Sequence, residues 1–428
     1  MAHLVHRAAF GARAATIDEL TELGYEGAVD ALCSFDAPDP AADAIPPPAF
    51  DTAGYLAAQG ADEDARRAAA RQNRAERRAL PLWWVRRMVA AEQPVRERLT
   101  FLWHDHFATS IEKVKLAELL FGQRRMLYAL GAGRFDELVH AVARDAAMLI
   151  WLDGRENIKG APNENFAREL LELFTLGLPG HHDAATYTED DIVDAARALT
   201  GWRIHRTTGM GVLDRRRHDN GPKDVLGDRG DLGLDEVVAA ATGHPACAPH
   251  VVARLWSRLA RPAAPDDPVV EELATPFADD LDVAALVRRM FLHPDFRSDA
   301  TRAALVRTPV DLVVGTCRAL GVDPDERILA VLFGLGQLPF LPPDVAGWPA
   351  NEAWLSTATA RLRLEWALAM AAEVDLDGLD LADGGPDGIA RLLGVERWSD
   401  ATSVVLENAT DPRQALALAI VAPEHLVA

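Results

Sequence analysis

Cysteine is scarce in this sequence. The three residues Cys33, Cys247 and Cys317 stand far apart and form no CxxC pair. This pattern argues against a thiolate metal site and a disulfide framework, and it favours a reducing compartment. Long apolar runs are also missing, because no stretch approaches the roughly 20 apolar residues of a membrane span. Residues 1–16 contain no apolar run of signal-peptide length, so we expect a cytoplasmic protein without a membrane segment.

Positive charge is in deficit. The chain has 44 Lys and Arg residues against 65 Asp and Glu residues, a formal charge of −21. Such a charge repels phosphate backbones and anionic lipid, so neither nucleic acid nor membrane is an expected partner. Several sequence motifs are missing as well. No GxGxxG or P-loop occurs, so no nucleotide cofactor is expected, and no GxSxG nucleophile elbow is found.

The 428 residues are 49% apolar and rich in Ala, Leu, Arg and Glu at helical spacing, whereas alternating β-branched runs are nearly absent. We predict an all-α fold, a single large multi-helix domain with long ordered loops and little or no β-sheet. The expected regions are N-terminal helices (1–35), a proline-rich connection (36–61), a main helical domain that carries the motifs (62–370) and a C-terminal helical extension (371–428). Within them we expect helices at 112–130, 135–149, 163–176, 188–200, 249–260, 281–292, 301–320 and 324–334.

The first candidate motif is Trp103-His104-Asp105-His106-Phe107. Histidines at i and i+2 are a familiar ligand pair, since imidazole binds Zn, Fe, Mn and Cu. On a regular helix these positions lie about 200° apart. Both imidazoles therefore reach one metal only if the helix unwinds near Phe107, which residues 108–110 would permit. The alternative is a hydrogen-bonded His106 in the core and a His104 on the surface.

The second candidate motif spans residues 162–172, with Pro162 and Asn163 at a helix start. In the structural interpretation, Glu164, Arg168 and Glu172 form an ion-pair ladder at i, i+4 and i+8. In the functional interpretation, Glu169 and Glu172 are neighbours at i, i+3, and such carboxylates build iron or manganese sites in helical bundles. The usual E-x-x-H partner is missing from this segment.

Two further motifs follow. In the first, Thr188 is a predicted N-cap, and the acids that begin at Glu189 occupy the first helical turn. In the second, His218 stands beside Asp219 in an irregular loop that continues to Lys223. This pair is either a set of metal ligands, a base oriented by a carboxylate, or part of a polar turn.

Together, in this order, these segments resemble a large bacterial family known only as domain of unknown function 1800. The matching stretches are WHDHF (103–107), DGRENIKGAPNENFARELLELFTLG (153–177), YTEDDI with ARALTGW (187–202), HDNGPKDVLG (218–227) and PPDVAGWP (342–349). In the family, Asn is more frequent at the position of Asp105, and many relatives begin with an export signal. The resemblance implies a set of motif residues but no established reaction.

The motif side chains include imidazoles and carboxylates but no thiolates, which favours iron, manganese or zinc. We expect a metal-dependent enzyme, in the first place an iron (or manganese) oxidoreductase acting on a small molecule or peptide. The alternatives are a metal-assisted hydrolase on the same site and a non-catalytic helical scaffold or partner-binding protein. Both enzyme interpretations require side chains that converge within about 5 Å of one point. The expected metal ligands are His104, His106, Glu164, Glu169, His218 and Asp219, and the expected catalytic residues are Arg168, Glu172 and Lys223.

Overall fold

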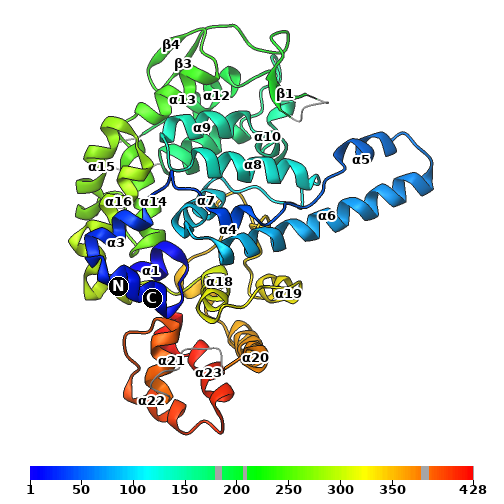
Figure 1. Cartoon of the computed structure of the whole chain (residues 1–428). Helices are drawn as coiled ribbons and strands as arrows, with labels where there is room; N and C mark the ends of the chain where they lie inside the picture. Colours follow the sequence, from blue (N-terminus) through cyan, green and yellow to red (C-terminus); the bar gives the residue numbers. More distant parts are fainter. Residues whose placement is uncertain (179–185, 206–209, 377–384, 428) are drawn as a thin grey trace.

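The computed structural model describes residues 1–178, 186–205, 210–376 and 385–427 (Figure 1). Helices form most of this chain, which confirms the predicted all-α class. None of the described helices is long and apolar enough to cross a membrane. The helices pack around two large apolar cores. One contains residues from Leu4 to Phe296, and the other joins Phe10 and residues 80–147 to the C-terminal part of the chain.

The N-terminal region forms a set of short helices and one long one. They are α1 Ala2–Ala9, α2 Ala14–Glu22, α3 Gly24–Leu32, α4 Pro40–Asp43, α5 Thr52–Ala58 and α6 Glu63–Ala90. The first half of α6 and the packed α5 project from the body as an arm (Figure 1). The last third of α6, after Pro81, is largely apolar and buried, with Trp84 and Met88 fully enclosed. The helix therefore changes along its length from a solvated segment to a buried one.

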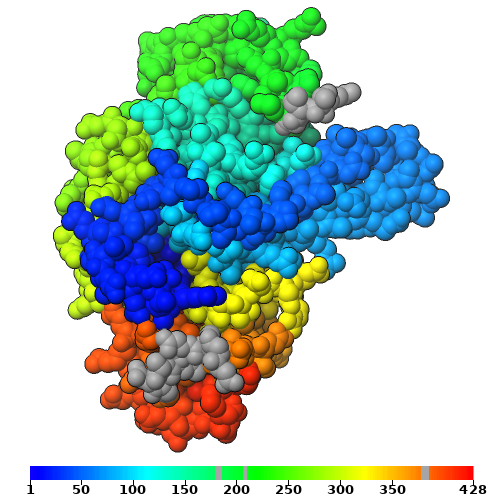
Figure 2. Space-filling model, in the orientation of Figure 1, coloured from blue at the N-terminus to red at the C-terminus, as the bar shows by residue number. Residues whose placement is uncertain are grey.

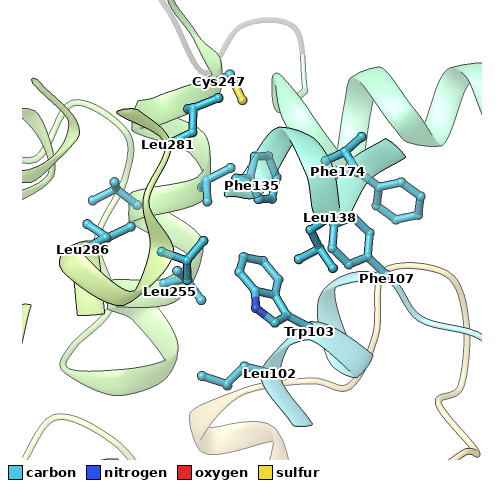
Figure 3. Close-up of a cluster of buried hydrophobic side chains, with 14 of the residues drawn as sticks. Leu102, Trp103, Phe107, Phe135, Leu138, Phe174, Cys247, Leu255, Leu281 and Leu286 are labelled. Carbon is cyan, nitrogen blue, oxygen red and sulfur yellow. The ribbon is translucent and has the colours of Figure 1, made fainter. Parts of the chain in front are cut away.

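The central helices enclose an aromatic core. They are α7 Pro94–His106, α8 Ala117–Leu130, α9 Phe135–Arg144, α10 Ala146–Trp151, the 3-10 helix η1 Gly154–Glu156, α11 Asn165–Glu169, the π-helix η2 Leu170–Thr175, α12 Glu189–Ala198, α13 Leu234–Gly243, α14 Cys247–Leu259, α15 Pro268–Asp280 and α16 Val283–Leu292. Trp103, Phe107 and Phe135 lie 5.6–6.3 Å apart between ring centroids (Figure 3). Full burial of each Phe-sized side chain contributes about 1.5–3 kcal/mol, which fixes α7 at the centre of the molecule.

Two small hairpins occupy part of the stretch 201–233 and provide the little β-sheet of the described chain. Strand β1 Trp202–Ile204 pairs antiparallel with β2 Gly211–Leu213, and β3 Lys223–Val225 pairs with β4 Asp228–Gly230. The second hairpin turns through Leu226 and Gly227, both with positive φ (55° and 90°). This geometry is the two-residue turn whose twist suits a hairpin.

The remaining helices complete the second core. They are η3 Pro294–Arg297, α17 Asp299–Arg302, α18 Pro309–Leu320, α19 Arg327–Gly334, η4 Asn351–Trp354, α20 Thr357–Glu373, α21 Gly385–Leu393, α22 Asp400–Glu407, α23 Pro412–Ile420 and α24 Pro423–Leu426. The prediction of one helix over 301–320 is wrong. The chain runs extended near Val306, which bridges to Val427, and Thr308 with Pro309 then starts α18. This bridge ties the C-terminal end of the described chain to the segment before α18, and the two ends of the chain lie close together (Figure 1).

Candidate functional site

The first motif lies at the end of α7 and ties this helix to several distant segments. Trp103 Nε1 donates to the carbonyl of Gly131 (2.7 Å), and Asp105 accepts from the backbone N–H of Trp348 (2.7 Å). Asp105 also pairs with Arg254 (3.3 Å) and Arg258 (2.8 Å) on α14. The backbone of Gly347 approaches so closely that an added Cβ would stand 2.3 Å from the carbonyl oxygen of Asp105.

His104 is buried, whereas the structural alternative placed it on the surface. Its Nε2 accepts from the backbone N–H of Phe340 (3.0 Å), and its ring packs against Trp84, Phe340 and Trp348. Burial lowers the pKa of His104 to about 3, so the ring is a neutral acceptor. Phe340 has a φ of 66°. His104 therefore holds a strained backbone position in the loop that follows α19.

His106 bonds a different segment. Its Nε2 donates to the carbonyl of Phe174 (3.1 Å), and its ring lies among Phe107, Phe135 and Phe174. Burial, followed by the charge of Arg254, lowers the pKa of His106 well below its ordinary value. The helix ends at Phe107, near the predicted position. The two imidazoles nevertheless hold separate backbone groups, and the alternative of a hydrogen-bonded His106 in the core matches the contacts.

The second motif contains a π-helix, which the sequence does not predict. In residues 170–175 the backbone bonds widen to i→i+5, as in the bond from the N–H of Leu176 to the carbonyl of Leu171 (2.8 Å). The last carbonyls of a helix lack partners within it. Here His250 donates to the carbonyl of Leu173 (2.9 Å), while His106 bonds that of Phe174. Two imidazoles thus cap the wide turn.

Arg168 gathers the carboxylates of this motif. It contacts Glu164 (3.2 Å), Glu172 (3.3 Å) and Glu189 (2.7 Å). The predicted i, i+4, i+8 ladder is confirmed, and Glu189 of α12 joins it. Hydrogen bonding to Glu189 raises the pKa of Arg168. Burial, followed by the charge of Glu172, raises the pKa of the half-buried Glu169.

The fourth motif closes the loop after α12. His218 Nδ1 donates to the carbonyl of Thr200 (3.0 Å). Asp219 accepts from the backbone of Gly221 and from Arg197 (both 2.9 Å), and the Gly221 bond is the main cause of its lowered pKa. The Lys223 side chain is fully buried, and its Nζ donates to the carbonyl of Leu232 (2.8 Å). Lys223 Nζ also pairs with Asp231 (3.3 Å), so this expected catalytic residue bonds a backbone carbonyl and a carboxylate of the neighbouring segment.

The structure brings some of the expected site residues together and separates the others. Arg168 joins Glu164 and Glu172, and Glu169 lies beside them, whereas His104, His106 and His218 each bond a different backbone segment. Across residues 1–178, 186–205, 210–376 and 385–427, no group of three or more His, Cys, Asp or Glu side chains is arranged to hold a metal ion. The convergence that the enzyme interpretations require is not found among these residues.

Sequence reasoning missed the buried charges that the fold depends on. Asp105 lies inside the first motif, and its position in an aromatic run was the one sequence signal that it is buried. Glu97, which is fully buried between Arg87 and Arg124, resembles an ordinary surface residue of an amphipathic helix. A third group, around Arg307, draws on residues from both ends of the chain and leaves no local pattern.

These contacts define a class of all-α proteins in which polar motifs anchor long loops to a helical body. The chain belongs to the family described as "Protein of unknown function (DUF1800)", which matches residues 3–427. The resemblance inferred from the motifs is thereby confirmed. No curated protein and no solved structure matches the chain.

Proposed function

We propose that this protein is a non-catalytic helical scaffold that binds a partner protein of acidic surface through the α5–α6 arm. The observation that carries this proposal is the use of the motif side chains. His104, Asp105, His106, His218 and Lys223 each hold a backbone group of another segment. These side chains hold loops in place, and few of their polar atoms remain available to bind a substrate. Iron, manganese or zinc chemistry stays a prediction without geometric support.

One stretch of the arm, which follows the exposed acids Asp62, Glu63 and Asp64, carries an excess of positive charge. Between residues 65 and 78 there are six arginines and one glutamate, although the whole chain carries −21. Arg66, Arg71, Arg74 and Arg78 are exposed, while Arg67 pairs with Glu63 and Arg77 bonds the carbonyl of Ile111. The arm stands clear of the body in Figures 1 and 2. A projecting row of cations is suited to steering an acidic protein surface into contact.

Metal analysis separates the scaffold from both enzyme interpretations. We expect purified protein to hold well under one equivalent of iron, manganese or zinc by plasma mass spectrometry, and its thermal midpoint to be unchanged by a chelator. A structural or catalytic metal would stabilise the folded state by mass action, so its removal would lower the midpoint. Stoichiometric iron, lost in a folded Glu169→Ala variant, would overturn the proposal in favour of the oxidoreductase. Stoichiometric zinc would favour the hydrolase.

The role of the arm is tested with a fluorescent glutamate-rich peptide. We expect saturable binding that weakens with added salt, since exposed charges are screened. A variant with Arg66, Arg71, Arg74 and Arg78 all changed to Glu should lose this binding. The matched control changes four exposed arginines on the body, Arg125, Arg155, Arg229 and Arg361, to Glu. Equal losses in the two variants, or tighter binding of duplex DNA than of the peptide, would contradict the assignment.

A further inference from the structure

A pocket of about 380 Å³ lies where the two ends of the chain meet. Its walls come from α1, the segment after α17, the loop after α21 and the last residues of the described chain. His3, His6 and Arg307 line its inner part, and Arg302 and Arg397 stand at its mouth. In Figure 1 this region is the junction between α1 and the C-terminal helices. The motif residues discussed above do not line it.

Positive charge is in excess around Arg307, the buried cation that lines this pocket, because Arg7 and Arg98 act on it from behind the wall. Arg7, Arg98 and Arg307 are all at least nine-tenths buried, with 4–5% of each residue exposed. The charge of one carboxylate, Asp311, acts on both Arg7 and Arg307, yet its hydrogen bond is to Arg98. Burial of a charged group is costly unless a counter-charge accompanies it. Here one carboxylate serves three guanidinium groups, so two of the buried positive charges have no counter-charge of their own.

Arg307 is the clearest case. Its Nη1 donates to Nε2 of His425 (3.1 Å), and its Nη2 donates to Nδ1 of His6. Both imidazoles are neutral, because burial and then Arg307 itself lower their pKa values, that of His425 to about 3. The two hydrogen-bond partners of this cation are therefore uncharged. Its Nε, together with Nε and Nη2 of Arg7, is buried without a hydrogen-bond acceptor in the described chain.

The pocket mouth adds further cations. Arg302 pairs with Glu396 (3.0 Å), and Glu424 accepts from the backbone of Ser399 (3.0 Å) and from Thr402. Arg397 is exposed. The charged residues that line the pocket or surround Arg307 comprise five guanidinium groups and three carboxylates, an excess of two positive charges. They are Arg7, Arg98, Arg302, Arg307, Arg397, Asp311, Glu396 and Glu424.

We infer that this pocket binds a phosphate group, either as free phosphate or as the monoester of a small metabolite. A dianion matches the excess charge, and guanidinium forks match phosphate oxygens in geometry. The volume exceeds that of phosphate alone, and Val395 and Val427 provide apolar wall for a small organic body. This inference does not depend on the scaffold proposal, since the two use different residues.

Calorimetric titration of the full chain with inorganic phosphate tests the inference, with ionic strength held constant by chloride. We expect one saturable site per chain. The double variant Arg302→Ala and Arg397→Ala removes exposed cations at the mouth and should bind about tenfold more weakly, because each charge-assisted bond carries substantial energy. The control pair is Arg229→Ala with Arg361→Ala, two well-exposed arginines elsewhere that also form ion pairs. It should bind as the unaltered protein does.

Three results would overturn the inference: no saturable heat, equal weakening in the mouth and control variants, or acetate binding as tightly as phosphate. A second titration with glycerol 3-phosphate identifies the source of the phosphate group. Tighter binding of this monoester than of inorganic phosphate indicates a metabolite, and equal or weaker binding indicates free phosphate. Both of these outcomes support the site.

Discussion

Replacing Glu97 by alanine is expected to lower the free energy of unfolding by about 3–5 kcal/mol, the usual cost of removing one partner of a buried ion pair. Glu97 is fully buried on α7 and accepts from Nε of Arg87 (3.1 Å), from Nε1 of Trp84 (3.0 Å) and from Arg124. Both arginines are 4–5% exposed. The alanine variant would leave the buried Arg124 without a carboxylate, and Arg87 would keep only its pair with the exposed Asp43 (3.0 Å).

Urea unfolding followed by tryptophan fluorescence measures this loss. Burial alone would raise the pKa of Glu97, but Arg124, Arg87 and Trp84 outweigh it and the pKa is lowered. The stabilisation by the charge is thus present in full above the ordinary carboxyl pKa of 4.5 and disappears as pH falls through the lowered value. The difference in free energy of unfolding between the unaltered protein and Glu97→Gln should therefore decrease as pH falls through that range. The exposed control Glu118→Ala should change stability by at most about 0.5 kcal/mol, and an equally small loss for Glu97→Ala would refute the prediction.

Replacing Asp105 by alanine should cost about 3 kcal/mol. The Asp105 carboxylate accepts from the backbone N–H of Trp348 and pairs with Arg254 and Arg258. An unpaired buried N–H costs about 1–3 kcal/mol. The lost ion pairs add less, because the Arg254 side chain is 30% exposed and solvent screens it. The loop that contains Trp348 would then detach from α7 and α14 more readily.

Hydrogen exchange at the amide of Trp348 gives the sharpest measurement of this effect, alongside the urea midpoint. The Asp105→Asn variant keeps an acceptor for the Trp348 amide but loses the charge. Protection of this amide from exchange should therefore be intermediate between the unaltered protein and Asp105→Ala. Asp344→Ala is the matched control in the same loop, since Asp344 is exposed and accepts from the backbone of Ala346. Unchanged protection of the Trp348 amide in Asp105→Ala would show that the loop is held by other contacts.

The fold class could be predicted from the sequence because helices depend on local signals. Thr188 caps α12 as predicted, with Asp191 completing the reciprocal bond. The break between α17 and α18 could not be predicted, since the bridge from Val306 to Val427 joins segments distant in sequence. Similarly, the division of the predicted helix 135–149 depends on Asp145, which leaves the helical conformation and caps α10.

The candidate site was harder to predict, because an imidazole has the same sequence signature whether it binds metal or backbone. The partners of His104 and His106 are the N–H of Phe340 and the carbonyl of Phe174, and backbone groups leave no trace in side-chain patterns. The Arg168 ladder was accessible, because its spacing is local to one helix. Its fourth member, Glu189, lies 21 residues further on and comes from α12.

The meeting of the two chain ends has a consequence for biosynthesis. His6 bonds the carbonyl of Gly394, 388 residues later, and Arg307 links it to His425. At translation rates of about 5–20 residues per second, the first helix emerges from the ribosome about 20–80 s before its partners exist. The side of α1 that carries His6 stays without those partners during this interval, whereas Leu4 and Val5 pack in the core cluster whose last member is Phe296. On the newborn chain, the polar contacts of the first helix with the C-terminal helices therefore form last, after the central helices that cover its apolar side have been made.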